Sequence, residues 1–459
     1  MIGYVWRAVS GKSALRKALQ KHFEGVQLGE IVTAAREFPI ISRVDVQMAL
    51  DQIFQDRPAS RLLGIHAQMG HETPTLAHLF AAGPFPMDIG PLQHDEVDIG
   101  DPLPVRCLKN GLWLSKDHSL AFAVLLGPSM RFGMVGGVHV EIAVSKGEQG
   151  AQFSQEFFRD LEVRVGAGRT YRGRVISLES QHDYLGRGGA VKVHRLRAVK
   201  REDVILPLKT LKLLDRNVAG FVAARERIKA LHFTSKKGLL FYGPPGTGKT
   251  HTIHYLASQL PQHTTLLITA EQVGLIGEYF RLARFLQPAM MVIEDVDLIA
   301  REREQMHNPG QEILLNKLLN EMDGLREDAD VIFILTTNRP DHLEPALASR
   351  PGRIDQAIEF PLPDEEGRRK LVQLYSGGLE VSPPIMDLLV RRTERASPAF
   401  IKELMRRAAQ VKIELGTDSI LDQSAVDGAI EEMLFTGGAL NLKLLGGPAA
   451  EPIPNTDVR

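Results

Sequence analysis

Residues 243–250 read Gly-Pro-Pro-Gly-Thr-Gly-Lys-Thr, and this stretch decides the fold of the second half of the chain. It fits the G-x-x-x-x-G-K-[ST] pattern of a phosphate loop at every position. Glycines let the backbone N–H groups of such a loop turn toward phosphate oxygens, and the helix that follows presents its positive N-terminal end. The predicted nucleotide-binding residues are Gly243, Pro244, Pro245, Gly246, Thr247, Gly248, Lys249, Thr250 and His251. Lys249 can reach the β- and γ-phosphates, and the Thr250 hydroxyl can bind Mg²⁺.

The segments around the loop predict a parallel α/β sheet. An apolar strand over 239–242 precedes the loop, and a helix over 251–259 follows it. A second strand, 290–293, ends in Glu294 and Asp295, and a third, 331–335, runs into Thr336-Thr337-Asn338. Nucleotides bind at the carboxyl ends of parallel strands, so these polar side chains are expected beside the loop. One acid should hold Mg²⁺ and the other should polarise the attacking water.

Residues 205–437 resemble an AAA-type ATPase module. The resemblance rests on the phosphate loop, on the run 320–324 (Asn-Glu-Met-Asp-Gly), on 335–340 with Asn338 in the sensor position, and on Arg350-Pro351-Gly352-Arg353. It implies a P-loop NTPase sheet with a C-terminal helical lid, ATP and Mg²⁺ as cofactors, and hydrolysis of ATP to ADP and phosphate. It also implies a homo-oligomeric ring, most simply a hexamer, in which Arg350 and Arg353 reach the γ-phosphate of a neighbouring subunit.

Two features differ from the usual pattern of that family. The acidic pair is reversed, Glu294 before Asp295, as in the mitochondrial AAA translocase of the Rieske protein. Register places Glu294 at the Mg²⁺-associated position and Asp295 at the water-polarising one, although the longer Glu294 side chain could also reach the water. The segment 272–278 has no aromatic residue where threading relatives carry a pore loop. Ala399, a predicted nucleotide-binding residue, stands where other branches carry a lid arginine, which the branch with paired arginine fingers commonly lacks, so it supports the resemblance.

The first 204 residues carry no motif of a known family. Helical spacing is expected over 1–55, loops or a linker over the Pro/Gly-rich 56–104, and short strands with one helix (152–161) over 105–201. The predicted organisation is an N-terminal region (1–104), a small α+β domain (105–204), the ATPase core (205–363), the lid (364–437) and a flexible tail (438–459).

Composition narrows the classes of partner. The 459 residues carry 55 Lys and Arg against 56 Asp and Glu, a net charge of −1, which gives no global attraction to nucleic acid or to anionic membranes. Cys107 is the single cysteine, and no apolar run approaches the roughly 20 residues of a membrane span. A cytoplasmic protein without a membrane span is therefore expected. The histidines at 66, 71 and 78 with Glu72 lack the spacing of a metal site, and a basic stretch over 187–201 is read as a solvated face.

Three functions remain open from the sequence. The leading hypothesis is an ATP-driven ring that remodels, unfolds or disassembles a protein partner recognised through residues 1–204. The missing pore aromatic favours a second one, a nucleotide-controlled assembly or scaffold that hydrolyses ATP slowly and threads nothing. The third is an AAA ATPase acting on nucleic acid, which is supported only by the basic stretch over 187–201.

Overall fold

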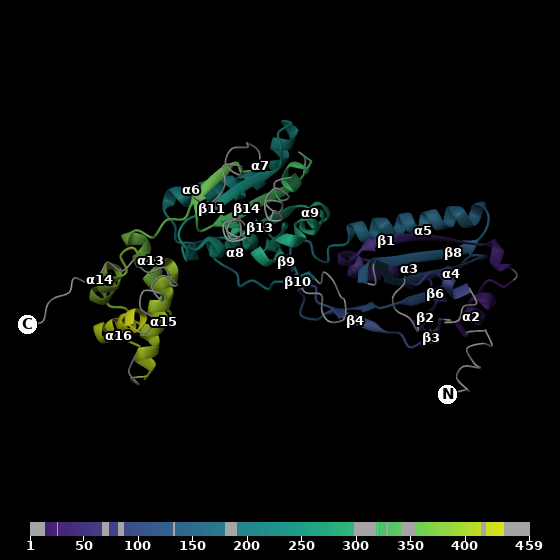
Figure 1. The fold of residues 1–459 in the computed structure, drawn as a ribbon, viewed down its shortest axis with the longest axis horizontal. Coiled ribbons are helices and arrows are strands. Elements are labelled where there is room, and N and C mark those ends of the chain that lie inside the picture. The colour runs from purple at the N-terminus through teal and green to yellow at the C-terminus, as the bar shows by residue number, and fades with distance from the viewer. Residues whose placement is uncertain are drawn as a thin grey trace, which may run out of the picture. The chain divides into compact units, whose positions relative to one another are not determined.

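The structure is a computed structural model that describes residues 14–24, 26–66, 73–80, 87–131, 134–179, 191–297, 318, 320–326, 329–340, 354–414 and 419–435. The chain divides into two compact units. Unit 1 comprises Met1–Tyr171 and Ser177–His194, and unit 2 comprises Arg172–Ile176 and Arg195–Arg459. Each is described by itself below (Figure 1).

Unit 1 is built on an antiparallel six-stranded sheet in the order β1-β8-β7-β6-β2-β3. Its strands are β1 Ile31–Pro39, β2 Arg61–His66, β3 Asp88–Gly90, β6 Gly111–Asp117, β7 Leu120–Arg131 and β8 Met134–Ser145, with a separate hairpin of β4 His94–Val97 and β5 Val105–Leu108. Its helices are α2 Ala14–His22, α3 Arg43–Gln55, α4 Leu76–Phe80 and α5 Glu148–Ala167, and short 3-10 turns are η1 Leu28–Glu30 and η2 Ile40–Ser42.

Helices cover both faces of this sheet because apolar side chains alternate along its strands. On β6, Trp113 packs with α3, where its ring stacks on Phe54 at 5.0 Å, and with α5 in the same core. Its neighbours Leu112 and Leu114 point the other way, into a second core with α2 and α4. In Figure 1, α5 lies along β1 and β8 of this unit.

The structure differs from the sequence-based organisation of this half. Residues 31–39, expected to be helical, form the edge strand β1, which pairs with β8 along its whole length. Residues 56–104, expected to be loops, supply β2, whose Leu63 and Ile65 are buried, together with α4, β3 and β4. Strands from both sides of position 104 share one sheet, so these residues form one unit rather than two. Long-range pairing outweighs the Pro/Gly-rich local composition, since it is what buries the apolar side chains of these strands.

Unit 2 contains the parallel sheet predicted from the phosphate loop. Its order is β9-β12-β13-β14-β11-β15, and the strands are β9 Val175–Leu178, whose first two residues belong to this unit, β11 Lys237–Tyr242, β12 Thr264–Ile268, β13 Ala289–Ile293, β14 Val331–Thr337 and β15 Gln356–Glu359. Strand β10, Val191–Val193, belongs to unit 1. The helices of this part are α6 Leu208–Asn217, α7 Ala219–Ala230, α8 Lys249–Gln259 and α9 Ile276–Phe285, with 3-10 turns η3 Arg201–Asp203 and η4 Ala270–Leu275. Because β14 lies between β11 and β13, the carboxyl ends of all three meet at one edge.

In the part of the chain that the structure describes after β15, four helices form the lid, and a helical lid was predicted. They are α13 Glu365–Tyr375, α14 Pro383–Arg392, α15 Pro398–Glu414 and α16 Gln423–Phe435. Asp364 caps α13 by accepting a 2.7 Å hydrogen bond from the Gly367 N–H. The helices enclose a core of their own, which includes Leu371, Phe400, Leu404 and Met433. Among the described residues, no helix is both long enough and apolar enough to cross a membrane.

Candidate active site

The phosphate loop connects the end of β11 to the start of α8. Gly243, Gly246 and Gly248 have φ angles of 149°, 76° and 96°, which disfavour any side chain. A Cβ at Gly243 would also collide with the carbonyl oxygen of Phe360, and one at Gly246 would lie 2.9 Å from Ala399 and Ser397 of the lid. The glycines are therefore required both for the turn itself and for the approach of the lid.

Lys249 begins α8 and is almost completely buried, with 7% of its surface exposed. Its ammonium donates hydrogen bonds of 2.8 Å to the Gly243 carbonyl and 3.0 Å to the Pro244 carbonyl. Burial lowers its pKa to about 8, against the opposing effect of Asp295 and Asp297. The loop thus holds a cation at its centre on two neutral acceptors, an arrangement suited to an anionic ligand.

The two acids after β13 diverge. Glu294 accepts a 2.7 Å hydrogen bond from the Thr250 hydroxyl of α8, whereas Asp295 accepts one of 3.0 Å from the Asn338 amide at the end of β14. Asp295 has a φ of 50°, in the left-handed region, and its N–H donates to the Thr336 hydroxyl at 3.0 Å. This backbone turn sends adjacent carboxylates to different partners, and strained backbone of this kind gathers at functional sites.

The surroundings of Asp295 raise the pKa of its carboxyl above the usual range. Burial raises the pKa of its carboxyl, and repulsion from Asp297 and Glu294 raises it further. Lys249 and the Asn338 hydrogen bond act in the opposite direction. A carboxyl whose pKa is raised in a cleft is a candidate for proton transfer.

Asp297 is a member of the site that the sequence analysis did not assign. It is 3% exposed, and its Oδ1 accepts a 2.9 Å hydrogen bond from the Thr337 hydroxyl and a 3.2 Å one from the Asn338 N–H. It therefore fixes the end of β14, from which Asn338 reaches Asp295. The available signal was a third acid, two residues after Asp295, together with the hydroxyls at the end of the strand 331–335.

A cavity of about 390 Å³ opens beside the loop. Besides the loop, Asp295 and Asn338, the cavity is lined by Asp203, Val204, Ile205 and Leu206 before α6 and by Leu371, Tyr375, Pro398, Ala399 and Lys402 of the lid. The Ala399 N–H donates a 3.2 Å hydrogen bond to the Gly246 carbonyl, and His251 Nε2 lies 3.2 Å from the Asp203 carbonyl. Of the lid residues here only Ala399 was predicted. Pro398 and Lys402 lie beside it on α15 and had no assigned role, and Leu371 and Tyr375 come from α13, which carries no motif.

The donor set fits a magnesium-bound nucleoside triphosphate. A buried lysine and a glycine turn suit the phosphates, and the Thr250 hydroxyl lies beside a carboxylate oxygen of Glu294, the pair of oxygen donors that Mg²⁺ prefers. Apolar side chains that line the cavity, such as Ile205, Leu206 and Leu371, suit a planar base.

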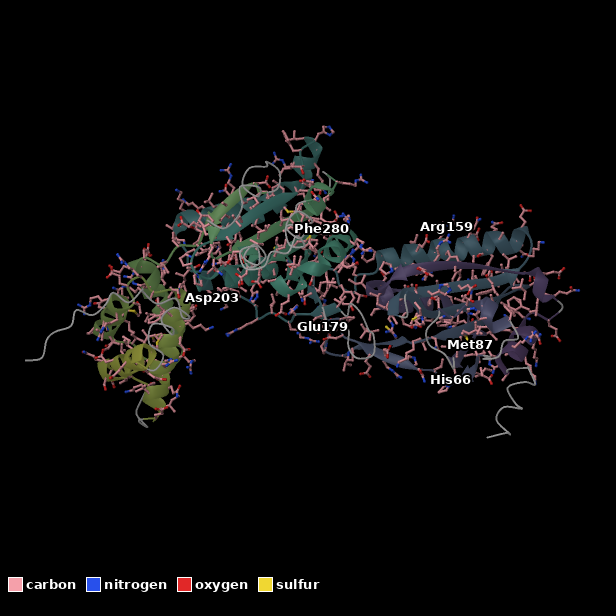
Figure 2. All side chains as sticks on the ribbon, in the orientation of Figure 1. His66, Met87, Arg159, Glu179, Asp203 and Phe280 are labelled. Atoms are coloured by element: carbon pink, nitrogen blue, oxygen red, sulfur yellow. The ribbon has the colours of Figure 1, made fainter. Side chains whose placement is uncertain are left out.

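Several predicted features lie elsewhere. Arg350 and Arg353, as well as His71, Glu72 and part of the basic stretch, fall outside the described residues. His66 ends β2 (Figure 2), and His78 lies on α4. Within the described ranges, no group of three or more His, Cys, Asp or Glu could hold a metal. Tyr279 and Phe280, next to the segment 272–278, are completely buried on α9.

Fold and site together define a P-loop nucleotide-binding protein with a helical lid. Residues 239–362 match the family described as "ATPase family associated with various cellular activities (AAA)". The chain thus contains an AAA domain.

Curated relatives extend this similarity beyond the matched segment. The chain is 32% identical to the proteasome-activating nucleotidase of Methanothermobacter thermautotrophicus over 252 residues, 52% of this chain and 57% of the relative. It is 34% identical to a 26S proteasome regulatory subunit 6B homolog of Aspergillus niger over 223 residues, 46% of this chain and 52% of the relative. The chain thus spans little more than half the length of these relatives, and the similarity covers about half of the chain.

Proposed function

We propose that this protein hydrolyses ATP to ADP and phosphate and uses the reaction, as an oligomeric ring, to remodel, unfold or disassemble a protein partner. The observation that carries the proposal is the meeting of three strand ends at one edge. There Lys249, Thr250, Asp295 and Asn338 line one cavity together with the lid, and the Thr250 hydroxyl donates to Glu294.

Each residue has a distinct part in the proposed reaction. Lys249 leaves its two carbonyl acceptors to bind the β- and γ-phosphates, where its full charge is restored by the anion. Asp295 accepts a hydrogen bond from the attacking water and orients it, while Asn338 holds that carboxylate and contacts the γ-phosphate. Thr250 and Glu294 would hold Mg²⁺, which, when bound, neutralises charge on the β- and γ-oxygens.

The ring is proposed on the resemblance of Arg350 and Arg353 to paired arginine fingers and on the relatives. A finger supplied by a neighbour makes the site complete only in the oligomer, so hydrolysis would depend on assembly. Two relatives are named proteasome-activating nucleotidase and 26S proteasome regulatory subunit, names that fit action on protein partners. Unit 1, outside the AAA domain, is the part available for recognising such a partner.

A second candidate function is a nucleotide-controlled assembly that hydrolyses slowly and threads nothing. It is favoured by the segment 272–278, which contains no aromatic side chain, while the nearest ones, Tyr279 and Phe280, are buried in the sheet's packing. Stimulation of ATP turnover by the protein partner distinguishes the two functions, because it is expected of a remodelling ring and not of a scaffold.

The first test compares the wild type with Lys249→Ala and with Lys209→Ala, an exposed lysine on α6. We expect Lys249→Ala to lose nucleotide binding and turnover and Lys209→Ala to retain both. Unchanged ATP affinity and turnover in Lys249→Ala would refute the assignment of the site.

The second test addresses the partner. An Asp295→Asn variant loaded with ATP is expected to retain its protein partner in a pull-down, and the purified partner should stimulate turnover of the wild type. A gel shift at low and high salt distinguishes nucleic acid, since binding to phosphates weakens steeply with salt. A partner that binds without stimulating turnover favours the scaffold.

A further inference from the structure

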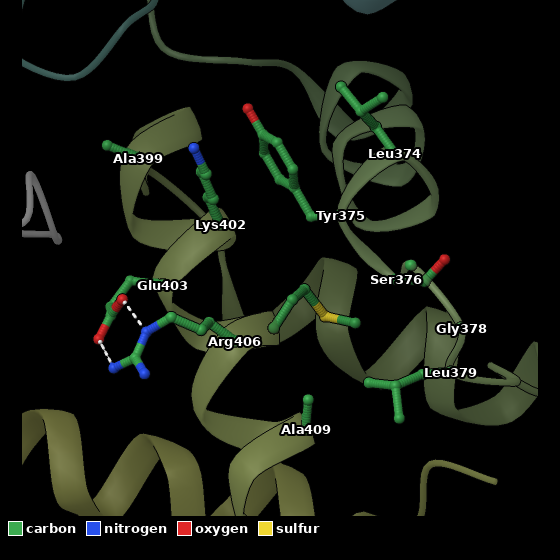
Figure 3. Close-up of a pocket in the computed structure, with 12 residues that line it drawn as sticks. Leu374, Tyr375, Ser376, Gly378, Leu379, Ala399, Lys402, Glu403, Arg406 and Ala409 are labelled. Carbon is green, nitrogen blue, oxygen red and sulfur yellow. Dashed lines mark hydrogen bonds and ion pairs between the residues drawn. The ribbon is translucent and has the colours of Figure 1, made fainter. Parts of the chain in front are cut away.

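Helix α15 carries the cationic residues Lys402, Arg406 and Arg407, and their surroundings differ. Arg406 donates two hydrogen bonds to Glu403, at 2.8 and 2.7 Å, and Arg407 donates another at 2.7 Å. These arginines hold the pKa of Glu403 at about 2, so this carboxylate is ionised and paired with Arg406 and Arg407. The ammonium of Lys402, one residue before Glu403, has no hydrogen bond or ion pair within the described part of the chain. Figure 3 shows Glu403 joined to Arg406 while Lys402 extends away from both.

Lys402 extends instead toward the nucleotide cavity, of which it is a lining residue. Its ammonium lies 6.0 Å from the centroid of the Tyr375 ring, a second lining residue from α13. One turn earlier on the same helix, Ala399 donates its N–H to Gly246 of the phosphate loop at 3.2 Å. Lys402 thus lines the same cavity as the phosphate loop, Asp203 and Tyr375.

We propose that Lys402 is a nucleotide-binding residue that contacts the α-phosphate and so ties the lid to bound ATP or ADP. The inference rests on the proposed nucleotide function of this cavity. Lys249 is assigned to the β- and γ-phosphates, so the α-phosphate is the phosphate left for a cation that enters the cavity from the lid. An exposed cation without a carboxylate partner can turn to this anion without breaking a salt bridge. Ala399, at the position of the lid arginine in other branches, contributes a backbone contact and no charge.

The test uses the full chain and two substitutions of the same lysine. Lys402→Gln keeps a polar side chain without charge, and Lys402→Arg keeps the charge. Arg406→Gln is the matched control, because Arg406 lies one turn further along α15 and does not line the nucleotide cavity. Dissociation constants for ATP and ADP are measured by titration calorimetry at two salt concentrations, together with unfolding temperatures without nucleotide.

We expect Lys402→Gln to weaken ATP and ADP equally, by about ten-fold, and to reduce the salt dependence of binding. Lys402→Arg should restore most of the affinity, and Arg406→Gln should leave it unchanged, with the unfolding temperature of Lys402→Gln equal to that of the wild type. Wild-type affinity in Lys402→Gln overturns the proposal, as does a loss confined to ATP, which would indicate the γ-phosphate. A loss without a change in salt dependence also overturns it. If the wild type itself binds neither nucleotide, the proposed function of the cavity fails, a result distinct from all of these.

Discussion

The Thr250 hydroxyl donates a 2.7 Å hydrogen bond to the Glu294 carboxylate and so joins the first turn of α8 to the end of β13. Glu294 is followed by Asp295, whose positive φ turns its own carboxylate toward Asn338. The reversed acidic pair is therefore divided between two strand ends, the longer side chain beside the threonine and the shorter beside the amide. This division supports Glu294 at the metal and Asp295 at the water.

Substitutions of the two acids are expected to have different effects. Asp295→Asn should bind ATP well and retain it uncleaved, because it removes the group that orients the water. Glu294→Gln should weaken Mg²⁺-dependent binding, because it removes negative charge beside the metal. ATP affinity with and without Mg²⁺ and single-turnover hydrolysis measure both effects. The roles are exchanged if Glu294→Gln retains uncleaved ATP while Asp295→Asn loses Mg²⁺-dependent binding.

Asp297 is expected to affect catalysis by holding Asn338 in position. Asp297→Ala leaves the Thr337 hydroxyl and the Asn338 N–H without their acceptor, which should cost about 1–3 kcal/mol of unfolding free energy. Because Asn338 then loses its fixed place, single-turnover hydrolysis should fall while ATP affinity stays near that of the wild type. Asp56→Ala, an exposed acid after α3, is the control for stability. Hydrolysis unchanged in a destabilised Asp297→Ala would assign this residue to folding alone.

The arginine pair gives a prediction about assembly. Arg353→Ala should bind nucleotide normally and lose hydrolysis by about 10³–10⁵-fold, the range for arginine fingers. Mixing it with Lys249→Ala should restore part of the activity, because each variant supplies what the other lacks at a shared boundary. Activity is measured against protein concentration alongside light scattering. Full activity in a strictly monomeric sample would contradict a finger acting from a neighbour.

Protonation of the buried His263 is expected to destabilise the folded protein in acid. Its ring, 5% exposed, accepts a 2.9 Å hydrogen bond from Arg225, and burial followed by that arginine's charge lowers its pKa to about 4. The unfolded chain, with a pKa near 6.5, binds the proton first as the pH falls, so stability decreases from about pH 6.5 to pH 4. The loss amounts to as much as about 3 kcal/mol.

His263→Gln tests this assignment, because it keeps an acceptor for Arg225 without a titrating group. Its unfolding temperature should depend less on pH over that window than that of the wild type, whatever its absolute value. His232→Asn, an exposed histidine in the left-handed region where asparagine is tolerated, should retain the wild-type slope. Equal slopes in wild type and His263→Gln would show that other groups carry the acid sensitivity.

The sequence by itself determined the parts of this protein that depend on neighbours in the chain. Residues 243–250 predicted a glycine turn between β11 and α8, and the polar ends of β13 and β14 predicted a meeting point at one edge of a parallel sheet. The helical lid over 364–437 is what the resemblance to AAA-type modules implies. These predictions succeeded because backbone conformation and amphipathic spacing are local properties.

Tertiary structure alone decided the rest. Residues 31–39 became a strand because β8 offers a partner along their whole length, and no local signal specifies a pairing more than a hundred residues away. The same holds for Asp297, whose role depends on Thr337 from another strand, and for Tyr375 and Lys402, which reach the cavity from two lid helices. Such contacts arise from packing between segments that are distant in the sequence. They therefore cannot be predicted from the type of residue at one position.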